Sequence, residues 1–336
     1  GEAFGKPYEL PPDQGYCETC AAIASIMWNL QMLLVTGEAR FADLMERTLY
    51  NGFLSGLAAD GLHFFYMNPL LSRGGYARRE WYGVACCPPN IMRLLASLGH
   101  YLVTADPTGL QIHLYNNCAI TTELASGQTV GLRLETDYPW QGQIKLTVQE
   151  TGRSAWALRL RVPGWCTAAQ VTVNNQALAD PLLENGYLVL ERVWSAGDVV
   201  ELALTLAPQL IEALPRIDAI RNSLAIEYGP LVYCLEAIDT PANLLDIHLE
   251  PETPLQAVWR DDLLPEPVMI IETTGYAINT DAWQGQLYRP LNSQSDHTEL
   301  GQPVPLTAIP YYAWANREPG QMRVWIPRLT GYKSQP

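Results

Sequence analysis

Positive charge is scarce in this sequence of 336 residues. Lys and Arg number 21 against 35 Asp and Glu, which gives a formal net charge of −14 at pH 7, and the basic residues form no cluster. Proteins bind phosphate backbones through Lys and Arg, so we expect no nucleic-acid partner. We also find no apolar run of about 18 residues, the length that a transmembrane helix needs, and therefore expect no transmembrane helix and no membrane partner.

Cysteine is sparse as well. The sequence has 7 cysteines, an odd number, and two of them, Cys86 and Cys87, are adjacent. Adjacent cysteines can pair with each other only with strain. The cysteines therefore predict no disulfide framework, and we expect reduced thiols and a cytoplasmic location.

The first hundred residues have the pattern of helices. We predict helices over residues 18–35, 38–58 and 91–103: the first is long and rich in Ala, Leu and Met, and the apolar residues of the other two recur at helical spacing. Residues 18–35 lack Pro and Gly and are apolar nearly all round, which predicts a helix buried among others. Three helices are too few to form a closed helical domain. We therefore expect this part to be the end of a larger helical assembly.

The pattern changes to alternating apolar and polar residues after about residue 105. Period-two alternation between turn residues is typical of an antiparallel β-sandwich. The alternating stretches cover residues 110–124, 130–140, 143–151, 157–165, 169–178, 186–194 and 198–206. A connection at 208–215 leads to a second, less regular β-rich region, in which residues 239–301 give no assignable pattern. The predicted fold class is a multidomain α plus all-β protein.

Two thiol clusters, "YCETC" at 16–20 and "ACCPPN" at 85–90, stand at the predicted starts of two helices. The N-terminus of a helix carries partial positive charge and free N–H groups, which favour thiolate over thiol. Two such ends brought together would form an anion-rich pocket. Zinc is the usual cation in sites rich in cysteine.

The residues alone leave four interpretations of these clusters open. A structural zinc site would use the thiolates of Cys17, Cys20, Cys86 and Cys87. A redox pair would use Cys17 and Cys20, although the βαβ context of such pairs is missing. A mixed-ligand site would include Glu18 and keep one thiolate as the reactive group. The cysteines could also be small core residues without a site.

Several stretches together carry a resemblance to a known family. They are "GEAFGKPYELP" at 1–11, "YCETCA" at 16–21, "FFYMNPL" at 64–70, "CCPPN" at 86–90, "YGPLVYCLE" at 228–236 and "LTAIPYYAWANR" at 306–317. With them the sequence resembles the C-terminal half of glycoside hydrolase family 127, the β-L-arabinofuranosidases. The resemblance implies that 1–105 is the C-terminal part of an (α/α)6 barrel, 106–210 a β-sandwich domain and 211–336 a second β-rich domain.

The resemblance also implies a zinc site and its ligands. It assigns zinc to Glu18, Cys20, Cys86 and Cys87, and it makes Cys17 a neighbour that does not bind the metal. Coordination to zinc holds a thiol in its thiolate form.

The same resemblance implies a retaining glycoside hydrolase that releases β-L-arabinofuranose from non-reducing ends of a glycoside substrate. Cys86 would be the zinc-bound nucleophile and Glu2 the general acid/base, while Tyr66 would contact the sugar. Retaining glycosidases place a nucleophile and an acid/base on either side of the scissile bond. Glu2 would protonate the leaving oxygen and then deprotonate the water.

The alternative function is a non-catalytic carbohydrate-binding or scaffold protein with a structural cysteine-rich zinc site, in which Cys17 is a ligand. The sequence leaves the oligomeric state open, including a homodimer. We expect Arg78 and Arg79 to lie in a solvated loop rather than to bind substrate. Two further residues, His63 and His100, match no motif of the family.

Overall fold

The fold was analysed in a computed structural model that describes residues 2–290 and 300–329. Gly1, which opens the first motif, residues 291–299 and residues 330–336 lie outside the described residues. The chain has both helices and several antiparallel sheets, and its contacts divide it into two compact units. The first unit consists of Gly1–Thr19, Leu54–Val84 and Pro208–Pro336, and the second of Cys20–Phe53 and Ala85–Ala207.

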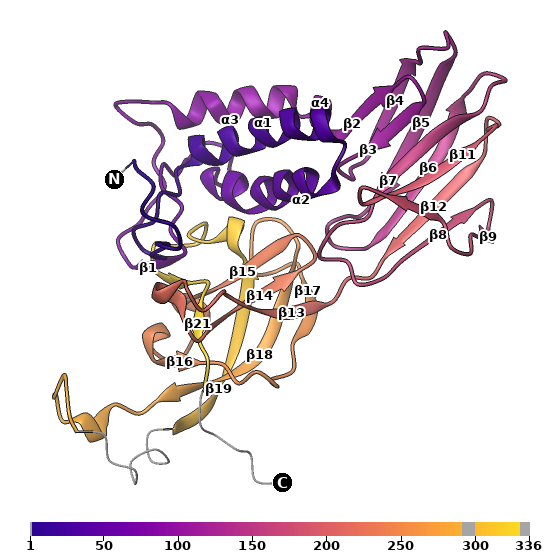
Figure 1. The fold of residues 1–336 in the computed structure, drawn as a ribbon. Helices are drawn as coiled ribbons and strands as arrows, with labels where there is room; N and C mark the ends of the chain where they lie inside the picture. Colours follow the sequence, from indigo (N-terminus) through magenta and orange to yellow (C-terminus); the bar gives the residue numbers. More distant parts are fainter. Residues whose placement is uncertain (1, 291–299, 330–336) are drawn as a thin grey trace. The chain divides into compact units, whose positions relative to one another are not determined.

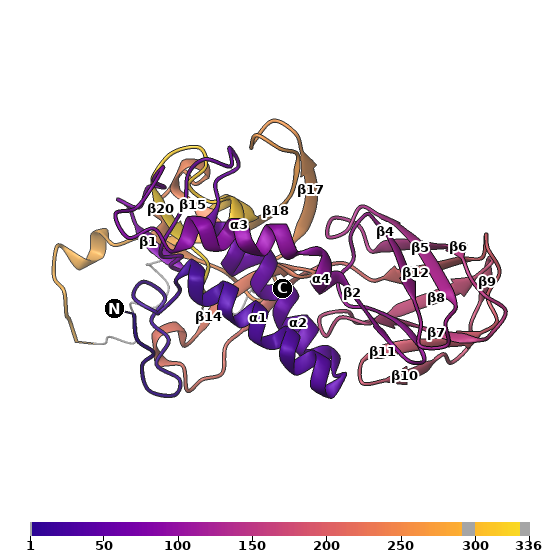
Figure 2. The same ribbon diagram turned by 90° about the horizontal axis from the view of Figure 1, so that it is seen from above.

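The second unit contains the helices that the sequence predicts. They are α1 (Thr19–Thr36), whose first residue belongs to the first unit, α2 (Ala39–Arg47), α3 (Cys87–Ser97) and α4 (Gly99–Leu102). Figures 1 and 2 show α1 and α2 running alongside each other. The predictions of helices over residues 18–35 and 91–103 are confirmed to within a few residues.

The longest helix, α1, was expected to be buried among others, yet part of it faces outward. Trp28, Leu34 and Val35 are 66%, 56% and 83% exposed. By length and composition α1 is apolar enough to cross a membrane, so the expectation that no such run exists was wrong. Core helices of soluble proteins meet the same two criteria. The exposed apolar face fits the hypothesis of a larger helical assembly.

The predicted helix over residues 38–58 changes its winding partway. In α2, Ala39, Ala42, Met45 and Glu46 are buried, and their spacing of three and four residues puts them on one face. After α2 the chain forms a π-helix over Thr48–Phe53 and a 3₁₀ turn over Leu54–Gly56. Thr, Asn and Gly occur here, and these residues have low helix propensity.

The rest of the second unit is the predicted β-sandwich. One sheet has the strand order β10-β11-β7-β3-β2 and the other β4-β5-β6-β12-β8-β9. The strands are β2 (Val103–Asp106), β3 (Gly109–Ile112), β4 (Cys118–Glu123), β5 (Thr129–Thr136), β6 (Gln143–Glu150), β7 (Trp156–Arg161), β8 (Ala169–Val173), β9 (Gln176–Ala177), β10 (Leu182–Glu184), β11 (Tyr187–Arg192) and β12 (Val199–Leu204). In β6, Ile144, Leu146 and Val148 alternate with outward polar residues and join the core between the sheets. One pair, β3 with β7, is parallel, unlike the expected antiparallel pairing.

The first unit is built on a 10-stranded antiparallel sheet, in which β18 and β19 form the longest pair (Figure 1). Its strands are β1 (Leu71–Arg73), β13 (Pro208–Glu212), β14 (Ser223–Tyr228), β15 (Leu231–Glu236), β16 (Ile247–His248), β17 (Gln256–Arg260), β18 (Val268–Ile278), β19 (Leu300–Pro310), β20 (Gln321–Arg323) and β21 (Ile326–Pro327). Part of the unassigned region 239–301 therefore forms strands, among them the hairpin of β17 and β18. The short strand β1 pairs with β20 and so attaches the segment 54–84 to this sheet.

Candidate active site and metal centre

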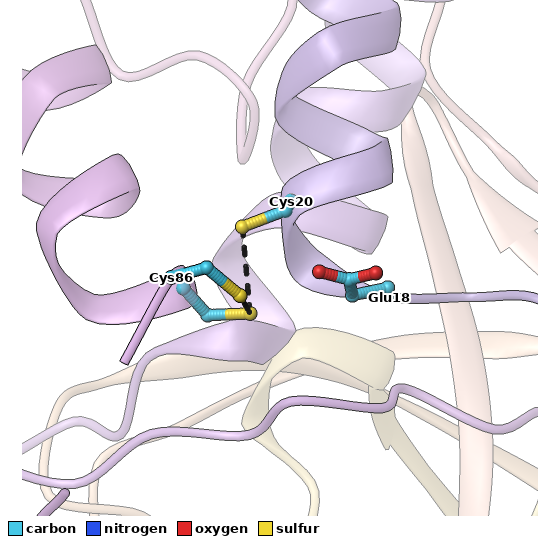
Figure 3. Close-up of side chains that lie close together, drawn as sticks. Glu18, Cys20 and Cys86 are labelled. Atoms are coloured by element: carbon cyan, nitrogen blue, oxygen red, sulfur yellow. Dashed lines mark hydrogen bonds between the residues drawn. The ribbon is translucent and has the colours of Figure 1, made fainter. Parts of the chain in front are cut away.

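Three thiols meet where two helices of the second unit begin. Cys20 is the second residue of α1, Cys86 is the N-cap of α3 and Cys87 is its first residue. The Sγ of Cys20 donates to the Sγ of Cys87 across 3.6 Å, and the Sγ atoms of Cys86 and Cys87 are 3.7 Å apart. Figure 3 shows the side chains of Cys20 and Cys86 approaching each other from their two helices.

The thiols and one carboxylate fit a zinc ion by distance and by type. Glu18 immediately precedes α1 and is 5% exposed. One ligand atom each from Glu18, Cys20, Cys86 and Cys87 lies within 4.8 Å of the others. Tetrahedral zinc with Zn–S bonds of about 2.3 Å separates its sulfur ligands by about 3.8 Å. The sulfur separations of 3.6 and 3.7 Å are close to that edge length.

The thiol of Cys17 points to a different partner. Its Sγ donates to the backbone oxygen of Gly15 across 3.1 Å, and burial raises its pKa. Among the described residues, the structure therefore brings Glu18, and not Cys17, together with Cys20, Cys86 and Cys87.

Burial is the main electrostatic influence on the thiols of the cluster. It raises the pKa of Cys20 and of Cys87. A hydrogen bond from the side chain of Asn90 opposes the shift at Cys20. Arg93 Nη2 donates to the Oδ1 of Asn90 across 2.5 Å, which leaves the amide nitrogen available to the thiol. A bound cation would favour the thiolate forms that burial disfavours.

The carboxylate of Glu18 has a hydrogen-bond donor that the sequence did not reveal. The hydroxyl of Tyr16 donates to the Oε2 of Glu18 across 2.9 Å. Glu18 also forms an isolated antiparallel bridge with Met67, so this part of the chain is extended. Residues two apart on an extended chain face the same side, and that spacing in "YCETC" was the available signal.

Glu2 and Tyr66, the predicted acid/base and sugar contact, are in contact within the first unit. The hydroxyl of Tyr66 donates a short hydrogen bond to the Oε1 of Glu2, and Glu2 is exposed. The backbone N–H of Tyr66 donates to the hydroxyl of Tyr82 across 2.9 Å, and the two rings meet edge to face at 5.8 Å. Tyr66 is thus held through its backbone while its hydroxyl reaches the carboxylate.

A cavity of about 380 Å³ opens beside Tyr66 in the same unit. Tyr66, Tyr76 and Tyr82 line it together with Gly74 and Gly75. The two glycines have φ of 101° and 84°, a backbone conformation that other residues rarely adopt. Apolar and aromatic walls with a few polar groups are typical of small-molecule sites.

Comparison with protein-family models assigns all three parts of the chain to one family. Residues 1–100 match "Beta-L-arabinofuranosidase, GH127 catalytic domain". Residues 109–206 match "Beta-L-arabinofuranosidase, GH127 middle domain", and residues 208–327 match "Glycoside hydrolase family 127 C-terminal domain".

Known relatives agree with these matches. The non-reducing end beta-L-arabinofuranosidase of Bifidobacterium longum subsp. longum is 35% identical over 97% of this chain and 51% of its own length. A crystal structure of a GH127 beta-L-arabinofuranosidase from Geobacillus stearothermophilus T6 superimposes with a TM-score of 0.89 at 40% identity, over 96% of this chain and 51% of that one. A GH127 beta-arabinofuranosidase structure gives a TM-score of 0.87 at 36% identity, over 98% and 52% of the two chains.

The family models and the named relatives are all glycoside hydrolases. This chain belongs to glycoside hydrolase family 127, which confirms the resemblance carried by its sequence motifs. It spans about half the length of the relatives that it matches.

Proposed function

We propose that the protein is a retaining β-L-arabinofuranosidase that removes the sugar from non-reducing ends of glycosides. The observation that supports this most is the convergence of Glu18, Cys20, Cys86 and Cys87 at two helix starts. The relatives at 35% and 40% identity are named as β-L-arabinofuranosidases, which supports the choice of sugar. We further propose that α1 to α4 belong to an (α/α)6 barrel.

Zinc is the proposed cofactor, and Glu18, Cys20, Cys86 and Cys87 would hold it. It would keep the cysteine side chains as thiolates near neutral pH and compensate their charge. The Tyr16 hydroxyl would fix one oxygen of Glu18 and leave the other for the metal.

In the first proposed step the Sγ of Cys86 attacks the anomeric carbon of the sugar. A C–S bond forms while the C–O bond to the leaving group breaks. The leaving oxygen takes the proton of the Glu2 carboxyl group, so the aglycone departs as a neutral alcohol. The hydrogen bond from Tyr66 to Glu2 supports this role because it fixes the direction of the carboxyl group.

In the second step water attacks the same carbon and the C–S bond breaks. The Glu2 carboxylate takes one proton of the water, and the electron pair of the broken bond returns to the Sγ of Cys86. Two displacements at one carbon give net retention of the anomeric configuration.

Proton NMR of a reaction on an aryl β-L-arabinofuranoside tests the proposal. We expect the β-anomer of arabinose to appear first, before mutarotation produces the α-anomer, and removal of metal by a chelator to stop the reaction. Initial release of the α-anomer would show inversion and would contradict a covalent Cys86 intermediate.

A further inference from the structure

Arg78 was expected in a solvated loop, but its guanidinium lies against a turn that comes more than two hundred residues later. Its Nη1 donates to the backbone oxygen of Trp314 across 2.5 Å. Its Nη2 donates to the backbone oxygens of Ser55 and Tyr312 across 3.0 and 3.4 Å. The planar fork of arginine can reach three carbonyls at once, which the single ammonium of lysine does not match. Arg78 therefore ties the segment 54–84 to the turn at 311–317.

The same guanidinium also contacts the ring of Phe65. It lies 4.3 Å from the ring centroid, a cation–π distance. Phe65 stacks on Trp314 with centroids 4.8 Å apart and an interplanar angle of 17°. Phe65 is 2% and Trp314 0% exposed, so the position of Phe65 depends on both side chains.

A buried charge network holds the turn that receives Arg78. Glu236 accepts from the backbone N–H of Ala315 across 2.7 Å and from Arg317 across 2.5 Å. Arg317 also donates to Asp239 across 2.5 Å. Ala315 has φ of 54°, a left-handed conformation that the hydrogen bond from Glu236 helps to hold. The network joins the motifs at 228–236 and 306–317, to which the proposed chemistry assigns no role.

Arg78 keeps its charge in this setting. Burial lowers the pKa of Arg78 to about 10, and the nearby charge of Glu236 opposes that shift. A charged guanidinium at neutral pH is needed for both the carbonyl contacts and the cation–π contact.

Phe65 is connected to the proposed acid/base, Glu2, through the next residue in the chain, Tyr66. The backbone N–H of Phe65 donates to the oxygen of Gly56 across 2.9 Å, and its oxygen accepts from Thr19 across 2.8 Å. The next residue is Tyr66, whose hydroxyl donates to Glu2. A displacement of the backbone at Phe65 would shift Tyr66 and therefore the hydrogen bond that Tyr66 donates to Glu2.

We propose that Arg78 is a positioning residue for Glu2, acting through Phe65 and Tyr66, and that the turn 311–317 makes the C-terminal domain part of the catalytic apparatus. This inference rests on the proposed role of Glu2. A misplacement of a catalytic group by about 1 Å can cost about 100-fold in rate.

The test compares two β-L-arabinofuranosides, one with an activated aryl leaving group and one with an alkyl or sugar leaving group, on the full protein that carries this chain. Only the poor leaving group needs the proton from the acid. For Arg78→Lys and Arg78→Met we expect kcat/KM to fall about 10- to 100-fold on the poor leaving group and less than about threefold on the activated one.

Three further variants control for the ring contact, for folding and for charge. Trp314→Phe keeps a ring against Phe65 and should retain most activity on both substrates, whereas Trp314→Leu should behave like Arg78→Met. Arg73→Met removes an exposed arginine of β1 and should leave both rates unchanged. Melting temperatures identify any variant that does not fold. If Arg78→Met or Trp314→Leu does not fold, the rates of the conservative variants Arg78→Lys and Trp314→Phe on the two substrates decide the test.

The outcomes separate the inference from the function on which it rests. If Glu2→Gln shows the leaving-group difference but the Arg78 variants lose equally on both substrates, Arg78 has only a structural role and the inference is wrong. If Glu2→Gln shows no such difference, the assignment of Glu2 fails, and the inference fails with it.

Discussion

The Sγ atoms of Cys20 and Cys87 lie 3.6 Å apart although the residues are 67 positions apart in the sequence. Each thiol stands in the first turn of a helix, where free N–H groups and the helix dipole favour negative charge. Burial acts in the opposite direction on both thiols. A bound metal ion would supply the stabilisation that the thiolate forms lose through burial.

Zinc content should depend on Glu18 and not on Cys17. We expect Glu18→Gln to lose zinc during dialysis, because a neutral amide replaces a charged ligand, whereas Cys17→Ser keeps one equivalent. Elemental mass spectrometry of the two variants, prepared alike, measures the difference. Loss of metal in Cys17→Ser together with full metal in Glu18→Gln would favour the structural all-thiolate site and a non-catalytic protein.

Tyr16 should tune the affinity of the metal site without being a ligand. Its hydroxyl donates to Glu18 across 2.9 Å, and Tyr16→Phe removes only that oxygen. Loss of a hydrogen bond to a ligating carboxylate costs roughly 10- to 100-fold in metal affinity. Competition with a chromophoric chelator measures the affinity. The control variant Tyr8→Phe should have the metal affinity of the wild type. An unchanged affinity in Tyr16→Phe would refute the predicted role of Tyr16.

Glu2→Gln should separate substrates by their leaving groups. An amide cannot donate the proton that a poor leaving group needs, so kcat/KM on an alkyl or sugar glycoside should fall about 100-fold or more. Cleavage of an activated aryl glycoside should fall much less in its first step. Steady-state rates on the two substrates measure the ratio. Equal losses would show that Glu2 is not the general acid.

Local patterns predicted the elements of the fold well. The long apolar run without Pro or Gly predicted α1, and the alternation of apolar and polar residues predicted β6, whose buried and outward residues alternate in the folded strand. The thiols at the helix starts could also be predicted, because Pro88 and Pro89 mark where α3 begins. The structure brings Glu18, Cys20, Cys86 and Cys87 close together, and their role as zinc ligands stays a prediction of the family resemblance.

Contacts between distant segments could not be read from the same patterns. Nothing near Arg78 in the sequence indicates that carbonyls of Tyr312 and Trp314 would receive it. The parallel pairing of β3 with β7 depends on the path of the chain between the two strands. The alternation of apolar and polar residues within a strand does not indicate its direction relative to a neighbour. The change to a π-helix after α2 is marked by no proline in the sequence of Thr48–Phe53.

Acid should weaken the second unit through His113, which is 0% exposed. Its ring nitrogens lie 2.8 Å from the Thr104 hydroxyl and 2.7 Å from the Tyr187 hydroxyl. Burial, and then the charge of Arg161, lowers the pKa of His113 from 6.5 to about 3. Between these values the unfolded chain binds a proton that the folded chain does not. The free energy of unfolding should therefore fall as the pH falls, by up to about 1.4 kcal/mol per unit from this residue.

Urea unfolding of the wild type and of His113→Gln at several pH values between 7 and 4 measures this contribution. The variant should be less stable at pH 7 but lose less stability on acidification, since its amide does not titrate. Parallel pH curves for the two proteins would show that His113 does not contribute to the acid sensitivity.

The most direct measurement of the central claim is peptide mass spectrometry after an acid quench during turnover of an activated aryl β-L-arabinofuranoside. The proposed mechanism predicts a pentosyl adduct on the peptide that contains Cys86, located on that residue by fragmentation and absent in Cys86→Ser. An adduct on a carboxylate instead, or efficient turnover by Cys86→Ser, would contradict the cysteine nucleophile.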